Sequence, residues 1–457
     1  MVSKKKIVAA LAGVSFSIFA QSASALSLNE ALSATYQTNP TLNAARAQLR
    51  GIDEKVPQAL SGWRPTITAA GSIGYVTRSA TGFDGQEYRD SSASLQLTQP
   101  IFRGFRTVNS TQQAEAIVRA QREQLRAQEQ ITFLEAATAY MDVIRDTALV
   151  SLRRSDLKFQ EEQVRAAKDR FNVGEGTRTD VSQAEAGRAG AQARLNAALA
   201  NLNSSRARFK QVIGLDPKNL TPRTNIARLL PKTVANAVAV GQQQHPSILA
   251  SQHTVDAGIY GVKTAEGELL PTADVQATVS NNNNTLPGVN GGGNTNQATI
   301  YGRVSIPLYQ GGRVYSRIRE AKEDLGRAEM LVDVSRDSVR AGAISAWGQL
   351  NASIASIRAA ESGVKAAKLA VDGVVEEQRV GQRTTLDVLN SQSALVDARV
   401  TLVTAQRDRV VASYSVLAAI GRLTFDDLGL NGTRYNPQDH YHQVRDKWFG
   451  LRTPDGR

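Results

Sequence analysis

The sequence contains two copies of one nine-residue stretch, at Val173–Val181 and Val380–Val388. The copies read VGEGTRTDV and VGQRTTLDV, so Val, Gly, Thr, Asp and Val recur at the same places, 207 positions apart (380 − 173). In each copy the Gly can close one helix in the left-handed conformation, and the Thr-x-x-Asp box can cap the next helix. We therefore expect two antiparallel helical hairpins with matching tips.

The same offset holds far from these stretches. The segment PIFRGFR from Pro100 matches PLYQGGR from Pro307, also 207 positions apart, and Pro40 matches Pro246 at an offset of 206. Agreement at Pro and Gly positions indicates a tandem duplication of about 200 residues. We interpret the chain as repeat 1, a linker, repeat 2 and a C-terminal segment, over residues 26–215, 216–236, 237–423 and 424–457.

The first 25 residues have the pattern of a secretory signal peptide: three lysines, an apolar stretch, and Ala-Ser-Ala before Leu26. Cleavage there removes three lysines and no acid, which lowers the formal net charge from +12 to +9. The chain contains no Cys, so we expect an exported protein that is not a lipoprotein. Its basic residues are scattered, which favours solvated helix faces over a nucleic-acid site.

Each repeat also contains stretches in which apolar and polar residues alternate, as at Val275, Ala277 and Val279. This period of two predicts amphipathic strand pairs at about 65–102 and 271–309, with polar loops at about 79–90 and 281–296. Four strands cannot close a barrel, and open strand edges are not tolerated in lipid. Three copies would supply twelve strands, an even number within the range of outer-membrane barrels.

Long segments without proline follow each strand pair, from Ile101 to Asp216 and from Leu308 to Asn436. We expect helical hairpins over about 104–214 and 311–421, with helices of roughly 100 Å that must pack along their whole length. A coiled-coil seam is predicted after the second tip, at Leu386, Leu389, Ser393, Val396, Val400, Val403, Arg407 and Val410.

Sequence motifs of common enzymes are absent: there is no P-loop, no G-x-S-x-G and no H-E-x-x-H. The four histidines lie outside the tip stretches, and the His440-x-His442 pair is interpreted as part of the tail rather than as a metal site. We therefore expect no catalytic activity, no cofactor and no metal.

The signal peptide, the duplication, the strand pairs and the two hairpins with V-G-x-x-T-x-x-D-V tips together resemble the TolC family of outer-membrane efflux ducts, over nearly the whole mature chain. The P-[IL]-[FY]-x-G segments before the long helices are also typical of that family. The resemblance implies a homotrimer with a twelve-stranded transmembrane β-barrel in the outer membrane of a Gram-negative bacterium. A long α-helical barrel would continue into the periplasm, with a mixed equatorial domain that includes the C-terminal segment.

The resemblance further implies an exit duct of a tripartite efflux or type I secretion system, which passes drugs, toxic amphiphiles or proteins. Its partners would be outer-membrane lipid, a periplasmic adaptor (membrane fusion) protein, and an inner-membrane pump such as a resistance-nodulation-division transporter. A periplasmic adaptor or a structural coiled-coil protein is the alternative, since adaptors also carry long helical hairpins. Adaptors lack two amphipathic strand pairs in tandem, so the strands favour the duct.

The resemblance also implies roles for residues at the tips. Adaptor docking would involve Val173, Gly174, Thr177, Val380, Gly381 and Thr384. The gate would involve Thr179, Asp180, Gln378, Arg383, Asp387 and Asn390. Of these, Thr179, Asp180 and Arg383 match positions that link neighbouring coils, and Asp387 matches a carboxylate that forms a ring in the constriction. The family's prototype has Tyr and Asp where this chain has Gln378 and Asn390.

Overall fold

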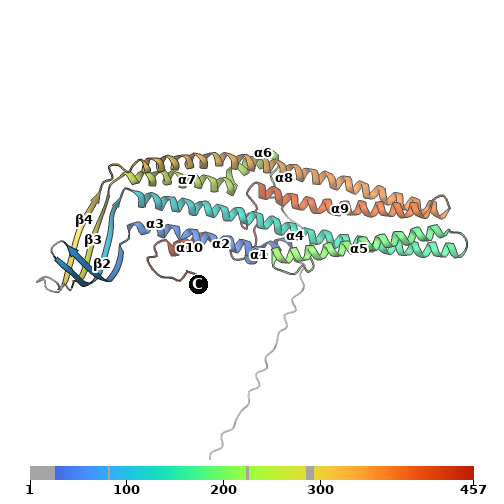
Figure 1. Cartoon of the computed structure of the whole chain (residues 1–457). Coiled ribbons are helices and arrows are strands. Elements are labelled where there is room, and N and C mark those ends of the chain that lie inside the picture. The colour runs from blue at the N-terminus through green and yellow to red at the C-terminus, as the bar shows by residue number, and fades with distance from the viewer. Residues whose placement is uncertain (1–25, 81–82, 223–225, 285–292, 457) are drawn as a thin grey trace, which may run out of the picture.

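The structure is a computed structural model that describes residues 26–80, 83–222, 226–284 and 293–456. The expected signal peptide, residues 1–25, lies outside the described residues. The molecule is elongated, with a sheet at one end and two helical tips at the other (Figure 1). In chain order its elements are α1 (Leu28–Thr38), α2 (Pro40–Asp53), α3 (Lys55–Leu60), η1 (Ser61–Trp63), β1 (Thr66–Ala80), β2 (Phe83–Arg103), α4 (Arg106–Asn172), α5 (Arg178–Ile213), α6 (Val234–Gln244), α7 (Pro246–Glu266), η2 (Gly267–Leu269), β3 (Thr272–Asn284), β4 (Gly293–Ser305), α8 (Arg313–Arg379), α9 (Thr385–Ala419) and α10 (Pro437–Val444).

The four strands form one antiparallel sheet in the order β1-β2-β3-β4. Their register aligns apolar residues in rows: Ala69 lies opposite Leu95, Leu95 opposite Val279, and Val279 opposite Ala298. Successive residues of a strand point to opposite faces, so one face of the sheet is apolar and the other carries mainly Ser, Thr, Gln and Asn. The helices extend away from the end of the sheet (Figure 1), and Ile300 on the apolar face is 80% exposed.

The strands are longer than the sequence pattern indicated, and the loops predicted at 79–90 and 281–296 are wrong for much of their length. β2 already begins at Phe83, and β3 continues to Asn284. In the second hairpin Asn281 lies opposite Asn296, and its side-chain amide donates a hydrogen bond to the side-chain Oδ1 of Asn296 at 2.7 Å. Cross-strand bonds of this kind satisfy polar side chains within the ladder, so a polar composition did not end the strands.

Two helices of 67 residues each, α4 and α8, run through most of the molecule. At 1.5 Å per residue each is roughly 100 Å long. Shorter helices lie beside them end to end: α1 to α3 and then α5 along α4, and α7 and then α9 along α8 (Figure 1). Small side chains at the α4–α5 contact, such as Ala184 and Ala191, are fully buried, which lets the two backbones approach closely. Among the described helices, none is both long enough and apolar enough to cross a bilayer.

The seam predicted after the second tip is shifted at its start. Leu386 is 42% exposed, whereas Thr385, Val388 and Leu389 are buried. The short turn before α9 brings the first residue of that helix against α8, where Thr385 accepts a hydrogen bond from the Gln378 side-chain amide at 3.3 Å. At the start of the seam Thr385, rather than the predicted Leu386, therefore faces α8.

The largest apolar cluster lies at mid-length, where α1 and the residues after α9 pack on α4, α5 and α9. Tyr140 of α4 is fully buried in it. Its hydroxyl accepts a hydrogen bond from the Thr221 N–H at 3.0 Å and lies 2.7 Å from the Leu26 carbonyl and 2.8 Å from the Thr221 carbonyl, within donating distance of both. Tyr140 therefore ties both the start of the described chain and the inter-repeat linker to the long helix.

Replacing Tyr140 with Phe is expected to lower the free energy of unfolding by about 1–3 kcal/mol, because partly buried backbone groups of Leu26 and Thr221 lose their hydrogen-bond partner. Tyr414→Phe is the matched control: Tyr414 is also fully buried, but its hydroxyl has no hydrogen-bond partner among the described residues. Its replacement should leave stability unchanged or raise it. Urea unfolding of the purified protein in detergent, followed by near-UV circular dichroism, measures both variants, and equal losses would contradict the assigned role of Tyr140.

Candidate functional site at the hairpin tips

Each tip is a turn closed by a glycine in the left-handed conformation, since Gly174 and Gly381 both have φ +81°. In the first tip the Gly174 N–H donates to the Phe171 carbonyl at 3.1 Å, and the Glu175 N–H donates to the Arg170 carbonyl at 2.8 Å. These paired bonds form a Schellman motif, which satisfies the last carbonyls of the helix. The second tip repeats it, with Gly381 N–H donating to Gln378 at 3.0 Å and Gln382 N–H to Glu377 at 2.9 Å.

The two helices that leave the tips begin at Thr177 and Thr384 through reciprocal hydrogen bonds with Asp180 and Asp387. The Asp180 N–H donates to the Thr177 hydroxyl oxygen at 3.1 Å, and the Thr177 N–H donates to the Asp180 carboxylate at 3.0 Å. The Thr384–Asp387 pair has the same bonds, at 3.2 and 3.0 Å. The hydrogen bond from the Thr177 hydroxyl holds the pKa of Asp180 below its usual range, and the Thr384 N–H does so for Asp387. Both carboxylates therefore carry a negative charge at neutral pH.

Two gate candidates of the second tip, Gln378 and Arg383, have partners within their own hairpin. The Arg383 Nε lies 2.7 Å from a carboxylate oxygen of Glu377, and this hydrogen bond raises the pKa of the guanidinium. Gln378 is half-buried and donates to Thr385. Asp180 is engaged in its capping box, so within one chain Asp180 and Arg383 are held by separate partners.

Valines occupy equivalent exposed positions at the two tips. Val173 and Val380 each end a long helix, one residue before the left-handed glycine, and they are 72% and 71% exposed. Thr179 and Asn390 of the gate set are exposed as well. The two tips therefore present matching exposed valine side chains, together with exposed polar side chains.

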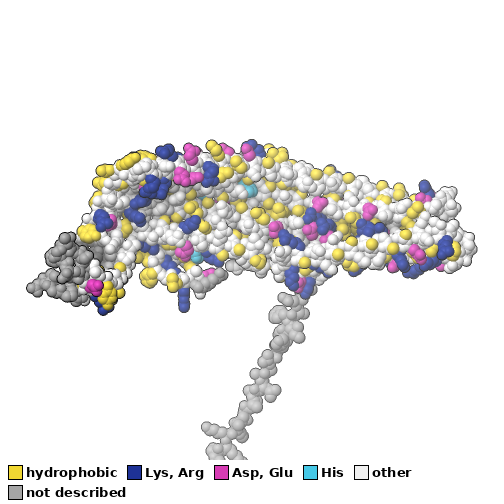
Figure 2. All heavy atoms as spheres, viewed as in Figure 1, with side chains coloured by type: hydrophobic (Ala, Val, Ile, Leu, Met, Phe, Trp, Pro, Cys, Tyr) yellow, Lys and Arg dark blue, Asp and Glu magenta, His cyan; other side chains and the backbone are white. Residues whose placement is uncertain are grey.

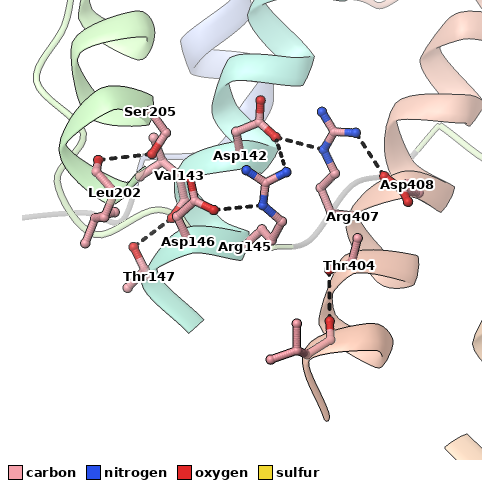
Figure 3. Close-up of polar contacts among 11 residues, drawn as sticks. Asp142, Val143, Arg145, Asp146, Thr147, Leu202, Ser205, Thr404, Arg407 and Asp408 are labelled. Atoms are coloured by element: carbon pink, nitrogen blue, oxygen red, sulfur yellow. Dashed lines mark hydrogen bonds and ion pairs between the residues drawn. The ribbon is translucent and has the colours of Figure 1, made fainter. Parts of the chain in front are cut away.

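A second polar cluster, at mid-length, joins the two hairpins. Arg407 of α9 donates to Asp142 of α4 at 2.9 Å and to Asp408 at 2.9 Å. Arg145 of α4 lies 3.1 Å from the same Asp142 and 2.8 Å from Asp146, whose side chain is only 5% exposed. Figure 3 shows both guanidinium groups directed at Asp142 between the two helices. The cluster therefore connects repeat 1 to repeat 2 through charge-assisted hydrogen bonds.

Arg407 occupies a predicted seam position, and a charged side chain at such a position requires a partner when it is buried. That requirement is the sequence signal for the mid-length cluster. The partner Asp142 lies 265 positions away on another helix, and no motif links the two residues. The sequence alone therefore did not identify the cluster.

Two of the histidines each pair with one carboxylate. His440 of the tail pairs through Nδ1 with Asp53 at 3.0 Å, and Asp53 is fully buried. Within the described ranges no group of three or more His, Cys, Asp or Glu residues is arranged to hold a metal ion. Figure 2 shows the basic and acidic groups scattered over the visible face of the helical body.

Comparisons with known proteins agree with this architecture. The profile of the family described as "Outer membrane efflux protein" matches residues 31–215 and 241–422, which correspond closely to the two repeats. The chain is 47% identical to the outer membrane efflux protein BepC of Brucella suis over 456 residues, which covers 99% of this chain and 98% of BepC. It is 27% identical to the outer membrane protein TolC of Escherichia coli over 450 residues, covering 95% and 90% of the two chains.

The fold is also similar to a solved outer-membrane channel. The Campylobacter jejuni CmeC channel superposes with a TM-score of 0.74 at 15% identity, covering 92% of this chain and 89% of CmeC. The expected resemblance to the TolC family is thereby confirmed. This chain belongs to the outer membrane efflux protein family, a family of transport channels.

Proposed function

We propose that three copies of this chain form an exit duct in the outer membrane, which serves a tripartite efflux or type I secretion system. The observation that carries the proposal is the four-stranded sheet. Its apolar face is exposed, and β1 and β4 at its two edges have no further strand partner within the described residues. In a bilayer no water reaches unpaired N–H and C=O groups, so these edges require other strand edges as partners.

The strand directions fit closure by several copies. Because β1 to β4 are antiparallel in chain order, β4 of one copy runs antiparallel to β1 of the next, and the ring can close. Two copies would give eight strands, whose interior is just wide enough to be filled by side chains. Three copies give twelve strands and a wider interior, in a closed cyclic assembly of identical contacts. We therefore propose a homotrimer.

The helices would extend the duct into the periplasm. α4 and α8 run from the sheet end to the tips, so the tips lie farthest from the proposed membrane level (Figure 1). The proposal places the docking of a periplasmic adaptor, and through it an inner-membrane pump, at Val173, Gly174, Thr177, Val380, Gly381 and Thr384. Drugs, toxic amphiphiles or proteins would pass along the axis. The alternative left by the sequence is a periplasmic adaptor. A soluble adaptor would expose the continuous apolar face of the sheet to water, which disfavours this alternative.

Cell fractionation and native mass measurement test the duct. The mature protein is expected in the outer-membrane fraction, and after gentle detergent extraction its mass should equal that of three chains. The physical reason is that a single copy leaves two strand edges open in lipid. A monomer in the soluble periplasmic fraction would refute the proposal.

The gate is proposed at the second tip, where each residue would occur three times around the axis. Asp387 would form a ring of three carboxylates, whereas Asn390 adds no charge, and like charges around a narrow opening attract cations. The pairing of Asp180 with Arg383 belongs to this proposal as a contact between neighbouring coils. It requires Arg383 to exchange its present partner Glu377.

Arg383→Ser is expected to raise the single-channel conductance in planar bilayers, because it removes a cation that links neighbouring coils in the closed tip. Arg379→Ser is the matched control, since Arg379 forms a comparable ion pair with Glu376 at 2.8 Å but is not a gate candidate.

Asp387→Asn keeps an oxygen for the capping box and removes the charge, so it should reduce cation selectivity. An unchanged conductance for Arg383→Ser together with an unchanged reversal potential for Asp387→Asn would refute the gate.

A further inference from the structure

The chain after α10 forms a short loop whose apolar side chains are almost fully exposed. Trp448 is 64% exposed and Phe449 is 90% exposed, and Leu451 is fully exposed. The base of the loop is closed by the Lys447 ammonium group, which donates to the Arg452 carbonyl at 2.6 Å. We call residues 447–452 the aromatic loop. Large apolar side chains that are grouped and exposed to this degree mark a surface that contacts a membrane or another molecule.

The aromatic loop is fixed beside the end of the sheet. The Arg64 guanidinium donates to the Lys447 carbonyl at 2.7 Å and lies over the Trp448 ring, 5.0 Å from its centre. Arg64 precedes the first residue of β1, Thr66, by two positions. Two residues span at most about 7 Å. The loop therefore lies level with the start of β1, although it is more than 380 positions away in the sequence.

The same level of the molecule carries other exposed aromatic side chains. Trp63 is 38% exposed, Phe105 58% and Tyr309 78%, and all three lie at the helix-side end of the strands. The Trp63 carbonyl accepts a hydrogen bond from the side-chain amide of Gln99 in β2, which fixes η1 to the sheet. Directly beyond this level, the apolar face of the sheet begins with Ile67. Aromatic residues at the border of an apolar band are the pattern of a membrane–water interface.

We propose that the aromatic loop is a membrane-interface anchor, which inserts Trp448, Phe449 and Leu451 among the phospholipids of the inner leaflet of the outer membrane. The proposal rests on the proposed barrel, because the barrel sets the level of the bilayer. The loop adds contacts outside the barrel wall, so the C-terminal segment holds the helical body against the membrane surface.

Charge and position together favour a lipid surface over a protein. Lys447 and Arg452 flank the exposed side chains, and the Arg64 guanidinium lies over the Trp448 ring. The single acid in residues 445–452, Asp446, lies 4.0 Å from the Arg445 guanidinium. Basic groups beside an apolar insertion attract anionic lipid headgroups. The loop is also continuous with the band of exposed aromatic residues at the end of the sheet, which a soluble partner would have to share with the membrane.

Tryptophan quenching by brominated phospholipids tests the anchor. The chain has three tryptophans, so Trp63→Phe with Trp347→Phe leaves Trp448 as the sole emitter. In vesicles of phospholipid brominated near the headgroup, Trp448 emission is expected to lose intensity relative to unbrominated vesicles. The control variant carries Trp63→Phe and Trp448→Phe, which leaves Trp347 in the helical body, and its emission should not change.

The possible outcomes separate this inference from the proposed barrel. Resistance of the protein to alkaline extraction from the same vesicles reports barrel insertion independently of Trp448. If the protein is inserted and Trp448 is unquenched by bromine but quenched by aqueous iodide, the loop lies in water and the anchor is refuted. If neither reagent quenches Trp448, a neighbouring copy covers it, which also refutes the anchor. A protein that alkali extracts would refute the barrel and the anchor with it.

Discussion

The edge strands β1 and β4, which have no further strand partner among the described residues, constrain the proposed assembly. In lipid these open edges require other strands as partners, and in the proposed duct other copies of the chain supply them. The helices follow directly from the sheet: α4 begins three residues after β2, through a turn in which Gly104 and Phe105 both have positive φ. A side chain at Gly104 would place a carbon 2.4 Å from the Gly267 carbonyl oxygen, so the two strand–helix junctions pack backbone to backbone. The orientation of the helical body is thus fixed at the sheet.

The distribution of contacts along the hairpins suits a duct that is rigid in the middle and adjustable at its tips. At mid-length a large apolar cluster and the Arg407–Asp142 network connect the two repeats. Closer to the tips, Arg153 and Asp397 are 3.3 Å apart in an ion pair whose carboxylate is largely exposed. Exposed ion pairs contribute little to stability because water and salt screen them. The tips themselves are stabilised mainly by bonds within each hairpin, so a change at the tip need not disturb the core.

The sequence predicted those features that depend on local chemistry. The Gly and Thr-x-x-Asp patterns located both tip turns, because a left-handed glycine and a capping box act within a few residues of each other. The alternation of apolar and polar residues located the amphipathic strands. Their ends were misplaced because Asn281 and its neighbours are satisfied by the opposite strand, which lies outside the local pattern. The partner of Arg407 and the position of Trp448 beside Arg64 depend on contacts across hundreds of residues, and no local pattern encodes such contacts.

The most direct test of the account is disulfide cross-linking between β1 of one copy and β4 of another. The natural sequence has no Cys, so a variant with one Cys in each strand reports only that contact. A panel would combine Thr299→Cys in β4 with a Cys at Thr66, Thr68 or Ala70 in β1, all on the same face of the sheet. If three copies form a closed ring, at least one pair, oxidised in membranes, will give a covalent species of three chains and none larger. Monomers alone across the panel, or a ladder that continues beyond three chains, would contradict a closed ring of three copies.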